Sequence, residues 1–270
     1  MLHGAGHSAM TFALVARYMT RADARVRVVA YDMRGHGYTV AKDERDLSSA
    51  TLVADALAVA GAVFARGQRV VVVGHSMGGA IAVRAALGAA GRFGLAGIVV
   101  VDVVEGSALA ALPAMNRVID STPAAFADLA AAVAYGMASG SGAQSGAAAR
   151  VTVPARLRRA PDGRWVWRTD LRATEPFWHG WFAGLSEEFL RVPAPKFLVL
   201  AGRDTLDTPL TIGQMQGKFQ IKFLPECGHL IQEDAPDDLG QALLAFAQRY
   251  AHPLQLPPHH IGGNLVVTPF

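Results

Sequence analysis

The chain has very little cysteine, and long hydrophobic runs are missing. Its one cysteine, Cys227, cannot form a disulfide within the chain, which is typical of a protein from a reducing compartment. The most apolar strand-like stretch, residues 95–101, is too short to span a bilayer and is followed by Asp102. The first residues contain neither a basic region nor a long apolar stretch, so no secretory signal is visible. We therefore expect an intracellular protein, cytoplasmic or nuclear, with no membrane partner.

Charge is also sparse. Charged residues make up 17% of the 270 residues, the net charge is +3, and lysine and arginine are scattered. The one local basic run, residues 156–159, is interpreted as a solvated loop face. This pattern does not predict a nucleic-acid partner. The hydrophobic content of 51% is enough to build a substantial core.

The most informative stretch is a run of four valines, Val70–Val73, that continues into Gly74-His75-Ser76-Met77-Gly78-Gly79 and an alanine-rich helical pattern. This order predicts a strand, a sharp turn and a helix, with Ser76 at the apex. Glycines are needed there because strand and helix approach closely. Such an elbow exposes the serine Oγ at the carboxyl end of a strand and directs the Met77 N–H into the same space. Ser76 is therefore the candidate nucleophile and Met77 a candidate oxyanion donor.

A second glycine-rich turn, residues 3–8, opens the chain. A loop without bulky side chains can direct a backbone N–H at the elbow serine, and we assign this second oxyanion contact to Ala5. Such a turn is expected at the end of a strand, and the earlier residues of that strand are not in the sequence. We therefore expect that the first strands of the sheet are missing and that the sheet has an exposed apolar edge.

Strands and helices alternate through the first part of the chain, and the expected strands are continuously apolar, with one at Val26–Tyr31. This predicts an α/β fold with a mostly parallel, doubly wound sheet. The alternation breaks between about residues 107 and 190 and then resumes. We expect core segments at 1–106 and 191–270 with an inserted cap at 107–190. The aromatic cluster in the cap is expected to be mainly core, and Trp178 and Trp181 are the candidates in it for contact with substrate.

A serine needs a general base, and the base needs an acid. His229 is the candidate base because it follows the last strand and comes after the acid candidates in chain order. His7 and His36 are reserves. The acid candidates are three aspartates that follow expected strands: Asp102, Asp204 and Asp207. Spacing alone favours the loop at Asp204 and leaves Asp102 possible.

Several longer segments resemble the protein phosphatase methylesterase branch of the α/β-hydrolase superfamily, and the likeness covers nearly the whole chain. The most specific of them are Asp102-Val103-Val104-Glu105-Gly106 and the stretch from Thr211 to Phe219 (TIGQMQGKF). They are joined by the elbow, the His3–Ser8 loop, Gly180–Ser186, Cys227-Gly228-His229 and Glu233–Pro236.

This resemblance implies that Asp102 is the acid of a triad with Ser76 and His229. It also implies the reaction, which is removal of the methyl ester from the carboxyl-terminal leucine of the protein phosphatase 2A catalytic subunit. No metal or cofactor is expected. The region matching a long charged insertion of some family members, about residues 150–165, is short here. Two alternatives stay open: another α/β-hydrolase carboxylesterase or lipase, and a non-catalytic phosphatase-binding module.

Overall fold

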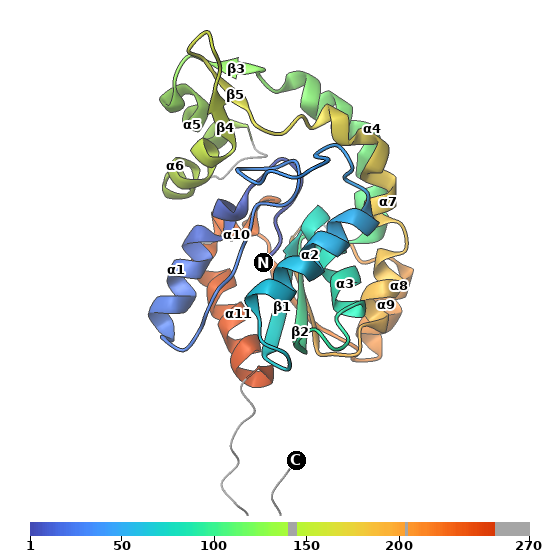
Figure 1. Cartoon of the computed structure of the whole chain (residues 1–270). Helices are drawn as coiled ribbons and strands as arrows, with labels where there is room; N and C mark the ends of the chain where they lie inside the picture. Colours follow the sequence, from blue (N-terminus) through green and yellow to red (C-terminus); the bar gives the residue numbers. More distant parts are fainter. Residues whose placement is uncertain (140–144, 203–204, 252–270) are drawn as a thin grey trace, which may run out of the picture.

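A computed structural model describes residues 1–139, 145–202 and 205–251 (Figure 1). Its main sheet has four parallel strands in the order β1-β2-β6-β7. Their bounds are β1 Arg69–His75, β2 Gly94–Val101, β6 Lys196–Ala201 and β7 Gln220–Leu224. β1, β2 and β6 become fully buried toward their carboxyl ends, as expected for strands covered on both faces.

Helices cover both faces of this sheet (Figure 1). On one face, α1 and α11 pack over a cluster that includes Val99 and Val101. On the other face, α2, α3 and α8 lie over a cluster that includes Ile98 and Val100. Neighbouring residues of β2 thus point to opposite sides, so one strand contributes to two cores. The helices are α1 Ala13–Ala22, α2 Ser49–Val63, α3 Met77–Leu87, α8 Leu185–Arg191, α9 Thr208–Met215, α10 Ile231–Asp234 and α11 Pro236–Tyr250, with the 3₁₀ helix η1 at Ala9–Phe12.

The expected strand at Val26–Tyr31 is wrong. The segment is non-helical but pairs in no ladder. Met1 and Leu2 lie near the edge of β1 that does not pair with β2. The amino-terminal nitrogen of Met1 donates to the carbonyl of Val29, and Leu2 forms an isolated parallel bridge with Gly74. Two residues do not supply a ladder, so the β-branched pattern here does not become a strand.

Part of the segment between β2 and β6 forms a layer above the carboxyl ends of the sheet (Figure 1), whereas other residues of it, such as Trp181 and Leu185, belong to the core beside the main sheet. This layer has its own antiparallel sheet in the order β3-β5-β4 and its own apolar cluster under that sheet. The elements are α4 Glu105–Ser121, β3 Ala125–Phe126, α5 Leu129–Ala138, α6 Gly146–Ala155, β4 Leu157–Arg159, β5 Trp165–Trp167, the 3₁₀ helix η2 Arg172–Phe177 and α7 Trp178–Phe182. The division of the chain at 107 and 190 into core and cap stays a prediction.

Candidate active site

Ser76 lies on a sharp turn between β1 and α3 and has a φ of 52°, a backbone conformation that residues other than glycine rarely adopt. The glycines around it are required by space. A Cβ on Gly74 would lie 2.1 Å from the carbonyl oxygen of Gly78, and a Cβ on Gly78 would lie 2.3 Å from that of Leu2. The strand and the helix therefore approach closely, and the turn presents Ser76 at the carboxyl end of β1.

Asp102 follows β2 and also has a φ of 52°. Its side chain is 5% exposed, and both carboxylate oxygens are occupied. Oδ1 accepts the N–H of Ala201 at 2.7 Å, and Oδ2 lies 2.7 Å from Nδ1 of His229. Because a carboxylate accepts, the Nδ1 proton of His229 points at Asp102 and Nε2 is the nitrogen left to act as a base.

The other acid candidates differ from Asp102. Asp207 begins α9: its Oδ1 accepts the N–H of Leu210, and its Oδ2 accepts the hydroxyl of Ser186 at 2.6 Å. These contacts give the carboxylate a structural role as a helix N-cap. Asp204, which spacing alone favoured, lies outside the described residues. Among the described aspartates, Asp102 is the one bonded to His229.

The remaining histidines near the site are buried. His75 donates from Nε2 to the backbone carbonyl of His229 at 2.8 Å, and the two ring centroids are 4.7 Å apart. Burial lowers the pKa of His75, His7 and His36, and lowers the pKa of His3 to about 3. These groups are neutral near pH 7. His75 therefore supports the backbone of His229. In the described part of the chain, neither of the alternative candidates for the base, His7 and His36, is bonded to a carboxylate within 3.5 Å.

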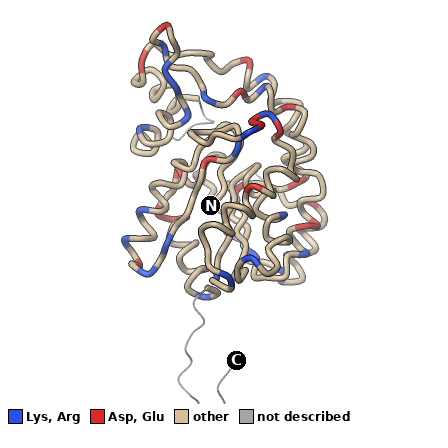
Figure 2. Tube along the Cα trace, viewed as in Figure 1, with Lys and Arg blue, Asp and Glu red and all other residues tan. Residues whose placement is uncertain are grey.

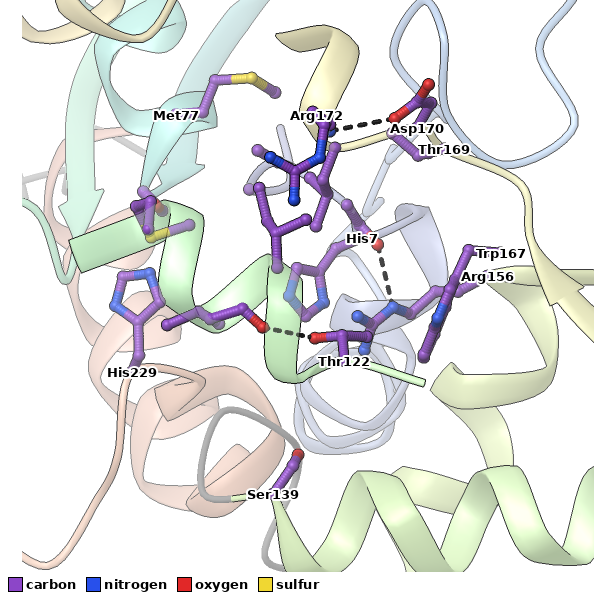
Figure 3. A pocket seen from close by; sticks show the side chains of 18 of the residues that line it. His7, Met77, Thr122, Ser139, Arg156, Trp167, Thr169, Asp170, Arg172 and His229 are labelled. Carbon is purple, nitrogen blue, oxygen red and sulfur yellow. Dashed lines mark hydrogen bonds between the residues drawn. The ribbon is translucent and has the colours of Figure 1, made fainter. Parts of the chain in front are cut away.

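A cavity of about 1220 Å³ lies between the sheet and the cap (Figure 3). Ser76, Asp102, His229 and the glycine loop at residues 4–6 all line it. Among the described residues, neither Ala5 nor Met77 donates its backbone N–H to a protein acceptor. Two free N–H donors beside a serine can stabilise a negatively charged oxygen in the cavity.

The two tryptophans considered for substrate contact are mainly core. Trp178 is 6% exposed and Trp181 is 1% exposed. Their indole N–H groups donate to Thr174 Oγ1 and to the carbonyl of Leu47, each at 2.7 Å. Both rings also line the cavity, so their contact with substrate stays a prediction.

The basic run at residues 156–159 is not a loop, because it contains the strand β4, but Arg158 and Arg159 are exposed as expected of a solvated face. Leu157 is buried, and Arg156 and Arg158 line the cavity. Arg156 donates from Nε to the carbonyl of Gly6 at 2.9 Å, and its guanidinium carbon lies 4.9 Å from the ring centre of Trp167 (Figure 3). The cap thus holds the glycine loop directly. The alternating placement of basic residues around Leu157 is the signal that could have indicated a strand.

Sequence reasoning also missed a buried carboxylate. Glu233 is 1% exposed and accepts hydroxyl hydrogen bonds from Thr11 at 2.5 Å and from Thr152 at 2.9 Å. Burial raises its pKa. It joins η1, the cap helix α6 and α10 below the site. No local spacing rule indicates this group, because its partners are 222 and 81 residues away in the chain.

Comparison with known proteins agrees with this geometry. Residues 1–242 match the model of the alpha/beta hydrolase family. A solved structure of E-2-(acetamidomethylene)succinate hydrolase superposes with a TM-score of 0.76 at 20% identity, covering 92% of this chain and 90% of the other. A Mycobacterium tuberculosis esterase superposes with a TM-score of 0.69 at 24% identity, covering 90% and 82%. The fold and the site define an α/β hydrolase.

The sequence relatives are more specific. A probable protein phosphatase methylesterase 1 of Caenorhabditis elegans is 44% identical over 251 residues, covering 93% of this chain and 68% of the relative. The Schizosaccharomyces pombe protein phosphatase methylesterase 1 is 42% identical, covering 95% and 75%. That of Mus musculus is 38% identical, covering 100% and 79%. The chain therefore belongs to the protein phosphatase methylesterase family, and it is a carboxylic ester hydrolase.

The described residues contain neither a candidate membrane-spanning helix nor a group of side chains that could hold a metal ion. No helix in this part of the chain is both long enough and apolar enough to cross a membrane. Nor are three or more histidine, cysteine, aspartate or glutamate side chains grouped there so that they could hold a metal ion.

Proposed function

We propose that this protein hydrolyses the carboxyl-terminal leucine methyl ester of the protein phosphatase 2A catalytic subunit through an acyl-enzyme on Ser76. One observation carries the proposal: Ser76 on its strained elbow and the Asp102–His229 pair line the same cavity in a chain up to 44% identical to named methylesterases. The phosphatase tail is the proposed partner, and residues 107–190 are the proposed cap over the site.

In this mechanism Ser76 Oγ attacks the ester carbonyl while Nε2 of His229 takes its proton. The N–H groups of Met77 and Ala5 hold the oxyanion of the tetrahedral intermediate. His229 then protonates the departing methanol, and the leucine carbonyl stays bound to Ser76.

Deacylation repeats these roles with water as the nucleophile. His229 takes a proton from the water, the acyl–serine bond breaks, and the free carboxylate is released with the serine hydroxyl restored. Asp102 stays ionised and stabilises the imidazolium in both halves of the reaction. The scheme needs no metal or redox cofactor.

The test is demethylation of the carboxyl-methylated phosphatase 2A catalytic subunit by the purified chain, followed by release of methanol. Ser76→Ala is the inactive variant, and Ser121→Ala, at an exposed position that does not line the cavity, is the matched control. We expect turnover by the native chain and by Ser121→Ala, and none by folded Ser76→Ala. Turnover of p-nitrophenyl acetate without demethylation would instead support a different carboxylesterase. Binding of the phosphatase by a folded chain with no turnover of either substrate would support a binding module.

A further inference from the structure

The cap hairpin formed by β4 and β5 carries three arginines in or beside its strands. Arg158 pairs with Val166 in the antiparallel ladder, and the N–H of Arg168 donates to the carbonyl of Arg156 at 2.9 Å. Arg156 and Arg168 are therefore opposite each other, one step beyond the ladder. Arg156 has a helical backbone at the end of α6, and its guanidinium is placed by its contacts with the carbonyl of Gly6 and the ring of Trp167. The three arginines share one feature, which is that they all line the catalytic cavity. We call these three residues the arginine face.

The arginine face is turned to the catalytic cavity. All three of its residues line the cavity, as does Val166 between them. Leu157, Trp165 and Trp167 pack on a separate apolar cluster, and Trp167 also lines the cavity. Basic residues gather along this hairpin in Figure 2, and Arg156 lies beside Trp167 at the edge of the cavity in Figure 3.

The charge of this face is not balanced within the described part of the protein. None of its three arginines has a carboxylate within 4.0 Å there, whereas the neighbouring Arg172 pairs with Asp120. Arg168 lies over the ring of Tyr38, and its buried Nε has no partner. Burial of the Arg156 guanidinium lowers the pKa of that side chain by desolvation. Like charges opposite each other in a hairpin destabilise it, so folding alone does not favour this arrangement.

The other wall of the cavity is apolar. The helix α4 contributes a row of side chains that includes Leu112, Met115 and Ile119. A ligand that fits both walls is an apolar chain that also carries a negative charge. Guanidinium groups bind carboxylates through charge-assisted hydrogen bonds with two parallel donors.

We propose that the arginine face binds an acidic side chain in the peptide that precedes the ester, so that the enzyme selects acidic peptide methyl esters over neutral ones. This inference rests on the proposed function, because it names the substrate feature read at the same site. The arginines are specificity-determining residues here, and the triad does the chemistry.

The test uses short amino-acetylated peptides that end in leucine methyl ester. They differ only by aspartate or asparagine at one of the four positions before the leucine. We expect kcat/KM to be at least about tenfold higher for aspartate at one of these positions at low salt. The preference is expected to fall as the salt concentration is raised, and this can be measured with the native protein alone. Arg158→Gln and Arg168→Gln are expected to lower the aspartate/asparagine ratio at least about threefold.

Arg159→Gln is the matched control, because Arg159 is the next residue of β4 and does not line the cavity. It removes the same charge and is expected to keep the native ratio. Equal kcat/KM for both peptides would overturn the inference and leave the proposed function standing. A ratio that survives in folded Arg158→Gln and Arg168→Gln would overturn it as well. Turnover of p-nitrophenyl acetate with none of any peptide ester would overturn the proposed function and this inference together.

Discussion

The Nδ1 atom of His229 lies 2.7 Å from Oδ2 of Asp102, although 127 positions separate the two residues in the chain. The aspartate is 5% exposed, while half of the His229 side chain is open to the cavity. A buried carboxylate thus anchors one edge of an accessible ring. The backbone carbonyl of His229 is held separately by His75. The ring orientation and its tautomer depend on these two contacts.

Replacing Asp102 with asparagine is therefore expected to lower kcat by about 10³–10⁴-fold. The amide keeps the size of the side chain but no longer favours a proton on Nδ1, and it does not stabilise the imidazolium. The measurement is kcat on p-nitrophenyl acetate and on the methylated phosphatase, with circular dichroism to show that the variant is folded.

Asp207→Asn is the control for that variant. Its carboxylate caps α9 and accepts from Ser186, so we expect a loss of about 1 kcal/mol in the free energy of unfolding with kcat within a few-fold of native. Asp204→Asn is expected to keep kcat within a few-fold of native, because Asp102 is the carboxylate bonded to His229. If either one reduced kcat more than Asp102→Asn does, the acid would have to be moved to the loop after β6.

The elbow could be predicted because its signal is local. A valine run, glycines at fixed offsets and a helical pattern all act within a few residues, and β1, Ser76 and α3 follow that order. Spacing favoured Asp204 as the acid, and only the family resemblance pointed to Asp102 instead. Three aspartates follow strands, and spacing does not tell which one meets a histidine on a distant loop. Only the folded arrangement does.

The misses have tertiary causes. Val26–Tyr31 has the composition of a strand, but a strand also needs a neighbour, and this segment pairs with no strand among the described residues. The run around Leu157 was interpreted by its charge, while its pairing with β5 decided its structure.

The buried histidines predict a loss of stability in acid. The pKa of His3 is lowered by burial to about 3, and those of His7, His36 and His75 are lowered too. Below the ordinary pKa of about 6.5 the unfolded chain takes up these protons and the folded chain does not. The free energy of unfolding is therefore expected to fall as the pH falls from about 6.5 toward 3, by up to about 1.4 kcal/mol per pH unit for each histidine.

Urea unfolding at several pH values between 7 and about 4.5 measures this slope. His3→Gln is expected to reduce the slope by about one proton, because one group that the folded state keeps neutral is gone. Glu233 acts in the opposite direction, since its raised pKa favours the folded state as its carboxyl is protonated. A free energy of unfolding that does not change over this range would contradict the prediction.

The elbow glycines predict a steric effect. A Cβ on Gly78 would lie 2.3 Å from the carbonyl oxygen of Leu2 and 2.4 Å from that of His3. Backbone atoms cannot move away cheaply, so Gly78→Ala is expected to destabilise the protein by at least about 3 kcal/mol and to displace the loop that carries Ala5. The measurements are the free energy of unfolding and the kcat of this variant.

Gly61→Ala tests the same chemical change where space is open. Gly61 lies within α2, and an added Cβ would meet nothing within 4 Å. Alanine is expected to stabilise the protein there by about 0.5–1 kcal/mol through helix propensity. If Gly78→Ala behaved like Gly61→Ala, the close approach of the glycine loop to the elbow helix would be wrong.

Arg84 is expected to make a large polar contribution to stability outside the site, because its guanidinium has five side-chain or backbone acceptors. It lies within the apolar helix α3 and donates from Nε to Glu188 at 2.8 Å. Its Nη atoms donate to the hydroxyl of Ser49 and to three backbone carbonyls, at residues 180, 181 and 183. One guanidinium thus joins α3 to α2, α7 and α8, beneath the cap aromatics.

Arg84→Gln is expected to lower the free energy of unfolding by roughly 2–4 kcal/mol, because Glu188 and the carbonyls lose a shared donor. Arg84→Lys keeps the charge but not the planar fork, so it is expected to recover less than half of that loss. Arg92→Gln, at an exposed position, is expected to stay within about 0.5 kcal/mol of native. A fully stable Arg84→Lys would show that charge alone, and not the geometry of five donors, holds these helices together.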